Sequence, residues 1–181
     1  MKNLTLAALF VALFSFQAFA QSEIEPVARH NKAIFVEALG NGIGVSANFD
    51  MRFKKGTQDG FGFRAGLGGS YLGSANNDAE NVHMGLITIP LSVNYLVGEN
   101  RSAFEAGVGI TPIYAKMDTH SPTKPQLADE NGWGSSGFLN LGYRFQPMEN
   151  GFVFRSNWTP AFNSTGFSPA WFGLSVGYGF K

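Results

Sequence analysis

Few side chains in this chain of 181 residues could do acid–base or nucleophilic chemistry. It has three histidines, His30, His83 and His120, and no cysteine, which excludes thiolate catalysis and cysteine-ligated metal sites. We place His83 and His120 in or beside loops, with Ser121 directly after His120. Neighbours in an extended chain point to opposite sides, which spoils a hydrogen bond between His120 and Ser121. Solvated loop side chains are therefore the simpler interpretation, and we expect no metal site and no cofactor.

A second candidate group consists of charged residues that alternate with apolar ones, so that they share one face of the predicted strands. They are Glu37, Asp50, Arg52, Arg64, Glu105, Arg144 and Arg155. Three acids and four arginines are a nearly balanced set that can pair internally, as buried charges must. A pore lining or an anion site is the alternative. Pairing also weakens the case for Glu37 and Glu105 as a catalytic carboxylate pair.

Strands must position these residues, because apolar side chains recur at every second place. The last stretch is the clearest, with Phe172, Leu174, Val176, Tyr178 and Phe180 separated by Gly or Ser. Segments of about ten residues with this alternation, aromatic ends and intervening turn signals are typical of a transmembrane β-barrel. We predict strands at about 33–39, 43–53, 61–74, 84–97, 102–116, 133–146, 151–162 and 170–180.

The separation of the first two strands depends on Gly40-Asn41-Gly42, since Asn-Gly is a strong hairpin signal. A turn there pairs Glu37 with Ser46 and makes the strand count even, as single-chain barrels require. Phe35 and Leu39 then fall on the polar face.

The predicted connections alternate in length, with short ones at 54–60, 98–101 and 147–150 and longer ones at 75–83, 117–132 and 163–169. Bacterial barrels have short periplasmic turns and longer outer loops, so this pattern also predicts the orientation.

These patterns carry a resemblance to known proteins. The last strand, with Tyr178 and Phe180 near its end, resembles the C-terminal assembly signal of bacterial outer-membrane proteins, although Lys181 follows the final aromatic residue. Residues 33–181 resemble the small barrels of the OmpA and OmpX type. The resemblance implies an all-β, eight-stranded antiparallel transmembrane barrel in the bacterial outer membrane. It also implies contact with outer-membrane lipids and with the barrel-assembly machinery.

The composition of the polar face indicates that it lies inside. A soluble lipocalin-like barrel shows the same alternation turned inside out, but its outer face needs many charges for solubility. Here the polar face carries about seven charges and is otherwise Gly, Ser and Asn. Such small residues suit the crowded interior of an eight-stranded barrel. We therefore expect a filled polar interior and an apolar outer surface.

The first twenty residues read as a secretory signal peptide, with Lys2, an apolar run and a small-x-small site at residues 18–20. Residues 21–32 are predicted to be a periplasmic lead-in, and 33–181 the barrel domain. The acidic and basic residues number 13 each, so no basic field exists for nucleic acid.

The leading functional hypothesis is a non-enzymatic barrel with a structural or surface-interaction role, in which the outer loops, especially 117–132, meet an external ligand. Lipid A acyltransferases and deacylases are also eight-stranded barrels, so the runner-up is such an enzyme with a rim site drawn from His83, His120 and Ser121. Pro90 and Pro112 on neighbouring strands would give it lateral access, whereas β-bulges near the rim are the simpler interpretation of Pro90, Pro112 and Pro160. A small-solute channel is the third alternative.

Overall fold

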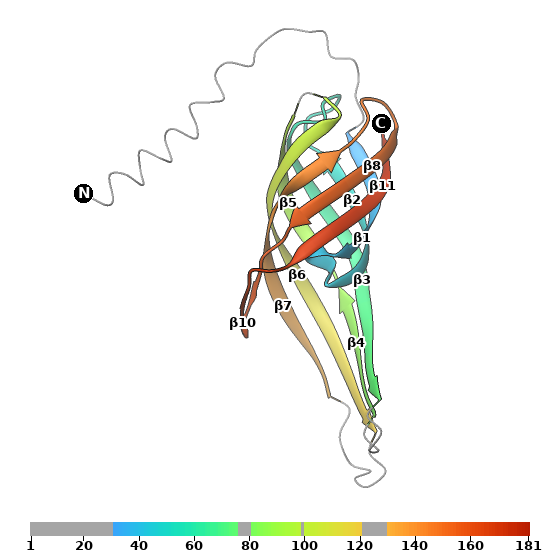
Figure 1. Cartoon of the computed structure of the whole chain (residues 1–181), viewed down its shortest axis with the longest axis vertical. Coiled ribbons are helices and arrows are strands. Elements are labelled where there is room, and N and C mark those ends of the chain that lie inside the picture. The colour runs from blue at the N-terminus through green and yellow to red at the C-terminus, as the bar shows by residue number, and fades with distance from the viewer. Residues whose placement is uncertain (1–30, 76–80, 99, 121–129) are drawn as a thin grey trace, which may run out of the picture.

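The alternation of apolar residues with small or polar ones produces a closed antiparallel β-barrel (Figure 1). The computed structural model describes residues 31–75, 81–98, 100–120 and 130–181. The spanning elements are β1 (Lys32–Leu39), β2 (Gly44–Arg52), β3 (Gly60–Ala75), β4 (Asn81–Thr88) continued by β5 (Leu91–Val97), β6 (Ser102–His120), β7 (Glu130–Phe145), β8 (Gly151–Trp158) and β11 (Phe172–Phe180). None of the described residues forms a helix with the length and apolarity needed to cross a bilayer.

Eight spanning strands are present, and the predicted eight-stranded fold is confirmed. β1 pairs with β2 on one side and with β11 on the other, which closes the sheet. Glu37 lies opposite Ser46, as the Asn-Gly turn predicts. The predicted signal peptide and most of the predicted lead-in lie outside the described residues.

The ladders fix how far the strands are staggered around the barrel. A path from each residue to its ladder partner leaves β7 at Tyr143, circles the barrel once and returns to β7 at Trp133, ten residues away. The path passes through Ser156, Leu174, Ala38, Val45, Gly69, Ile87 and Tyr114. With a rise of about 3.4 Å per residue and a strand spacing of about 4.8 Å, this stagger gives a strand tilt of about 40°.

The wall of the barrel has two heights. The four consecutive strands β8, β11, β1 and β2 have eight or nine residues each and form a short wall. The strands β3, β4 with β5, β6 and β7 form a tall wall, in which β6 alone has 19 residues. We call the end with both the C-terminus and the short connections the turn end. The tall wall projects from the opposite, loop end (Figure 1).

The prolines interrupt strands without creating bulges, so the bulge interpretation is wrong. Thr88 pairs with Ile113 before Pro90, and Leu91 pairs with Ile110 after it, so no residue is inserted. Backbone hydrogen bonds cross both neighbouring seams, from Ile89 N–H to the Pro112 carbonyl (3.0 Å) and from Gly66 N–H to the Pro90 carbonyl (2.9 Å). The register beside Pro160 is equally continuous, since Leu141–Trp158 and Gly137–Phe162 belong to one alignment.

The long connections are shorter than the sequence predicts because strand pairing continues beyond the barrel. β3 runs to Ala75, and β6 and β7 enclose only residues 121–129, which lie outside the described residues. The third connection contains a small hairpin, β9 (Ala161–Asn163) with β10 (Gly166–Ser168). β9 continues the line of β8 along β7.

Candidate functional site

The interior of the barrel contains a single chain of seven alternating charges. The order of contacts is Arg52, Asp50, Arg144, Glu105, Arg155, Glu37 and Arg64. Their residues come from β1, β2, β3, β6, β7 and β8, and each is at most 2% exposed. The structure thus brings together all seven charged residues that the sequence places on one face.

The ion pairs differ in how close their atoms lie. Arg64 Nη1 is 2.7 Å from Glu37 Oε2, and the Asp50 carboxylate lies 2.8 Å from Arg52 Nη2 and 2.9 Å from Arg144 Nη1. Arg155 donates two hydrogen bonds to Glu105, one of them from Nε at 2.9 Å. Longer contacts join Arg155 to Glu37 (3.6 Å) and Arg144 to Glu105 (4.0 Å). Every acid therefore contacts two arginines.

Neutral side chains complete this network. The Asn94 amide donates to Asp50 (2.8 Å) and to Glu105 (3.2 Å), which bridges two acids. The ring of Phe35 lies 4.5 Å from the Arg155 guanidinium carbon and 5.7 Å from that of Arg64. Phe35 is thus on the polar face, as predicted, and offers a cation–π surface to two arginines. Buried polar side chains and ion pairs thus fill the turn-end part of the interior.

The turn η2 (Gly40–Gly42) folds into the barrel and closes this core on its loop-end side. The hydroxyl groups of Thr111 and Thr88 donate to the carbonyls of Asn41 (2.7 Å) and Gly42 (2.8 Å). From the connection before β11, the Trp171 indole donates to the Gly40 carbonyl (2.8 Å). Residues on three separate segments therefore hold the turn inside.

Both residues that flank η2 have positive φ, at 60° for Leu39 and 64° for Ile43. This region of φ is strained for side chains with a Cβ, and especially for β-branched Ile43. Leu39 is half exposed rather than buried on the polar face. Its predicted placement is wrong because the reversed backbone turns the side chain out of the interior.

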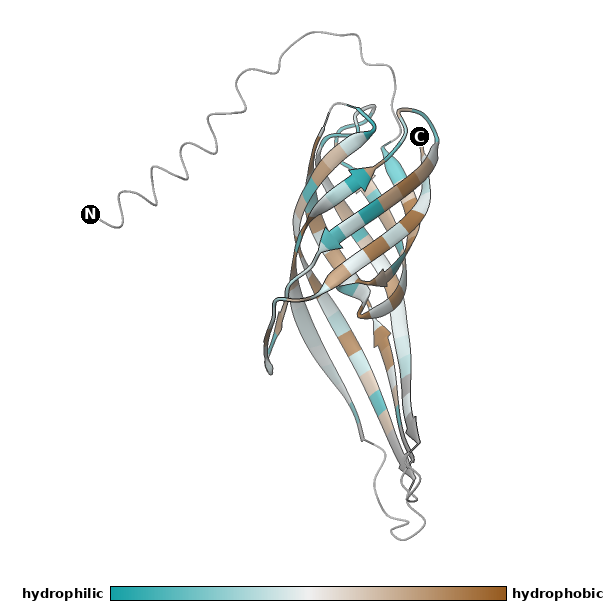
Figure 2. Cartoon of the chain, viewed as in Figure 1, coloured by the Kyte–Doolittle hydropathy of each residue, from teal (hydrophilic) through white to brown (hydrophobic). Residues whose placement is uncertain are grey.

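The outer surface is apolar and spans the height of a membrane on the tall wall. Brown segments alternate with white or teal ones along the strands in Figure 2, and exposed apolar side chains such as Phe104, Val108 and Ile110 form the outer stripe of β6. Ten residues separate Phe104 from Tyr114, which at a tilt of about 40° is roughly 25 Å along the barrel axis. That height matches the apolar band of outer-membrane barrels.

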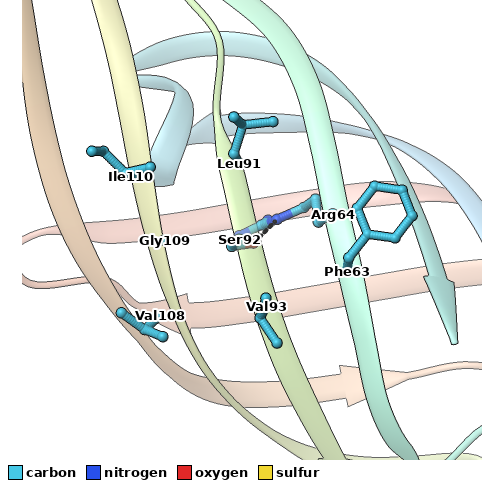
Figure 3. Close-up of a pocket in the computed structure, with 8 residues that line it drawn as sticks. All are labelled: Phe63, Arg64, Leu91, Ser92, Val93, Val108, Gly109 and Ile110. Carbon is cyan, nitrogen blue, oxygen red and sulfur yellow. Dashed lines mark hydrogen bonds between the residues drawn. The ribbon is translucent and has the colours of Figure 1, made fainter. Parts of the chain in front are cut away.

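The chain is a closed eight-stranded barrel with a polar interior and an apolar outer surface. A shallow groove on its outer wall shows how sharply the faces separate (Figure 3). Apolar residues of β3, β5 and β6 line it, while Arg64 reaches away from Phe63 toward Ser92 and donates to its hydroxyl (3.1 Å).

The barrel is similar to solved outer-membrane proteins. Ail, the attachment invasion locus protein of Yersinia pestis, aligns at 12% identity and a TM-score of 0.49, over 84% of this chain and 96% of Ail. Ail in complex with the heparin analogue sucrose octasulfate aligns equally well. The N-terminal β-barrel domain of Pseudomonas aeruginosa OprF aligns at 14% identity and 0.46, over 84% of this chain and 99% of that domain. No family model and no curated protein matches the sequence.

The described rim candidates for catalysis, His83 and His120, lie on the adjacent projecting strands β4 and β6. His83 stacks on Tyr71 with ring centroids 5.7 Å apart. In the ladder, His83 lies opposite Asp118, and His120 lies opposite Asn81. Ser121 and His30 lie outside the described residues. No group of three or more metal-ligating side chains occurs in the described part of the chain.

Tyr178 and Phe180, the residues of the predicted C-terminal assembly signal, lie at the turn end of β11. Tyr178 pairs with Ile34 and Phe180 with Lys32, so this last strand also closes the barrel against the first. Tyr178 is half exposed on the outer surface. The sequence did not predict that Thr88, Thr111 and Trp171 donate hydrogen bonds to the carbonyls of η2. The only indication of this role in the sequence is that both threonines fall on the inward face of their strands.

Proposed function

We propose that this protein is a non-enzymatic outer-membrane barrel that acts in surface interaction through the projecting part of its tall wall. The short connections then face the periplasm and the loop end faces outward. The observation that carries the proposal is that β3, β4, β6 and β7 continue as a paired sheet beyond the outer aromatic residues Tyr114 and Trp133. A barrel that served only to span the membrane would not need this sheet.

The projecting sheet offers two edges for recognition. Residues 70–75 of β3 pair only with β4, and residues 130–136 of β7 pair only with β6, among the described ladders. Free edge strands present N–H and C=O groups that can pair with an extended segment of a partner protein. The side chains exposed near the β7 edge include Trp133, whose ring lies 5.3 Å from that of Tyr114. We propose an external protein as the partner of this sheet.

A trimmed barrel tests this function. In the variant, residues 73–83 and 116–131 are each replaced by an Asn-Gly turn, which removes the projection and leaves the membrane-spanning part. Cells lacking the protein are complemented with the wild-type or trimmed chain, and their adhesion to protein-coated surfaces is measured. We expect the trimmed chain to insert, to migrate differently before and after boiling, and to leave adhesion at the level of the deletion strain. Wild-type adhesion by the trimmed chain would refute the proposal.

The two alternatives have less support in the structure. A channel for small solutes needs an open path, whereas the seven paired charges and the inward turn fill the interior. A lipid-modifying enzyme needs a base whose nitrogen is held by an acid, and within the described part of the chain His83 Nδ1 has no hydrogen-bond partner. The His83 ring stacks on that of Tyr71, and Asp118 lies opposite His83 in the ladder.

A further inference from the structure

The inner face of β4 and β6 in the tall wall changes from polar to apolar near the loop end. Thr88 and Thr111 point inward, because their hydroxyls bind the inward turn η2. The next inward residues are Leu86 and Met84 on β4 and Ile113, Ala115 and Met117 on β6, since side chains alternate along a strand. Leu86 pairs with Ala115, and Met84 with Met117. We call these five residues the inner apolar strip.

The short wall ends below this strip. On β11, Tyr178 is the third residue from the turn end, as Phe104 is on β6, but only six residues separate Tyr178 from Phe172 at the other end of β11. Six residues correspond to roughly 15 Å of height, against roughly 25 Å for the tall wall up to Tyr114. About 10 Å of wall is therefore absent above β1, β2 and β11. Ile113, next to Tyr114, lies at the level of this gap.

The gap faces the bilayer at hydrocarbon depth, because the outer apolar band of the tall wall extends to the same height. The edge of the short wall is itself apolar, and Leu39, Val45 and Phe172 are each at least 50% exposed along it. The outward turn of Leu39 at positive φ adds to this edge. The lipid-facing surface thus continues over the edge of the short wall to the inner apolar strip. The turn η2 and Trp171 separate the strip from the polar core below.

We propose that an acyl chain of an outer-leaflet lipid enters through this gap and packs on the inner apolar strip. Water at this place would face apolar side chains on the strip and on the edge, which is unfavourable because apolar surface is best removed from water. A lipid chain covers both surfaces. The site is distinct from the seam at Pro90 and Pro112, where hydrogen bonds hold the strands together. It also requires no chemistry, so it is independent of the proposed surface interaction.

The absence of cysteine makes the test direct, because a single introduced cysteine carries a single spin label. Ile113→Cys, Ala115→Cys and Leu86→Cys variants of the full chain are labelled with a nitroxide and reconstituted into phosphatidylethanolamine–phosphatidylglycerol bilayers. Collision of the label with oxygen, which enters hydrocarbon, is compared with collision with a water-soluble nickel chelate. Ile110→Cys supplies the lipid-facing reference on the same strand, and Asp59→Cys supplies the aqueous reference in an exposed turn.

We expect the oxygen-to-nickel ratio at Ile113→Cys and Ala115→Cys to match that at Ile110→Cys. A ratio like that at Asp59→Cys would show that water, not lipid, covers the inner apolar strip, and would overturn the proposal. Low collision with both reagents would show that protein covers the strip, and would overturn it as well. A boiled and unboiled sample of each variant on a detergent gel establishes that the barrel is folded, and the label at Leu86→Cys replaces either β6 variant that fails.

Discussion

The two halves of this barrel differ in the side chains that their strands turn inward, most clearly on β4 and β6. In the turn-end half the sheet is closed by eight strands, and the inner face carries Glu37, Asp50 and Glu105 with four arginines. In the loop-end half the wall is incomplete, and the inner face of β4 and β6 carries Leu86, Ile113 and Ala115. The outer face is apolar in the first half, and on the tall wall it stays so up to Tyr114.

The difference indicates that the polarity of the inward side chains depends on whether the ring of strands is closed at their level. A closed ring of strands separates an interior from the lipid, so that interior can hold charges as long as each is paired. Where three strands stop early, the lipid site that we propose leaves the inner face of β4 and β6 open to the surrounding apolar phase. The threonines that hold η2 mark the boundary between the two regions. The predictions that follow test each side of this boundary.

The largest effect is expected in the closed half. Glu105→Gln removes the negative charge between Arg144 and Arg155 and leaves both arginines buried with one acid each. Removing one partner of a buried ion pair costs about 3–5 kcal/mol of unfolding free energy. Urea unfolding in detergent, followed by loss of the folded gel band, measures it. Asp59→Asn in an exposed turn is the control, and an equally small change in both variants would contradict the ion-pair chain.

A somewhat smaller effect is expected on the outer face. Val108→Arg places a charge near the middle of the apolar band of β6 and should destabilise the inserted barrel by about 2–4 kcal/mol. Ser135→Arg lies on the same face of the neighbouring β7, near the outer aromatic residues, and should cost no more than about 1 kcal/mol. Reversible folding into lipid vesicles measures both variants. Equal costs would mean that the band does not span the membrane as described.

The boundary itself should show the smallest effect. Thr111→Val keeps the shape of the side chain but removes the hydroxyl that donates to the buried Asn41 carbonyl at 2.7 Å. An unsatisfied buried carbonyl costs about 1–3 kcal/mol. The matched control is Thr57→Val, whose hydroxyl bond to the Lys54 carbonyl is exposed, and which should stay within about 0.5 kcal/mol of wild type. Identical stabilities would show that Thr111 does not hold the turn.

The positions of the strands could be predicted because side chains alternate between the two faces of a strand, and only one register keeps the apolar residues on the same face. Once Asn41-Gly42 sets the first turn, Glu37 must lie opposite Ser46, and the structure has this register. The same alternation places the seven charged residues on one face. Their partners could not be predicted, because the ten-residue stagger decides that Arg155 reaches both Glu105 and Glu37. That stagger is the sum of all the ladders and has no local signal.

The errors have local physical causes. The inward path of Gly40–Gly42 depends on hydrogen-bond donors from Thr88, Thr111 and Trp171, which are distant in the sequence. This path also turns the Leu39 side chain from the inner to the outer face. The loops were predicted too long because Lys116 and the residues after it lack the apolar alternation, although their backbones remain paired with β7. The prolines were assigned to bulges, but the uninterrupted register needs no extra residue.

The central claim is that the closed half contains a filled polar core and that function lies at the projecting end. Conductance of the purified wild-type chain in planar lipid bilayers tests this claim most directly. The paired charges and the turn held by Thr88 and Thr111 predict no stable open-channel current at either voltage polarity. A stable current of uniform size would contradict the filled core and would favour transport of small solutes as the function.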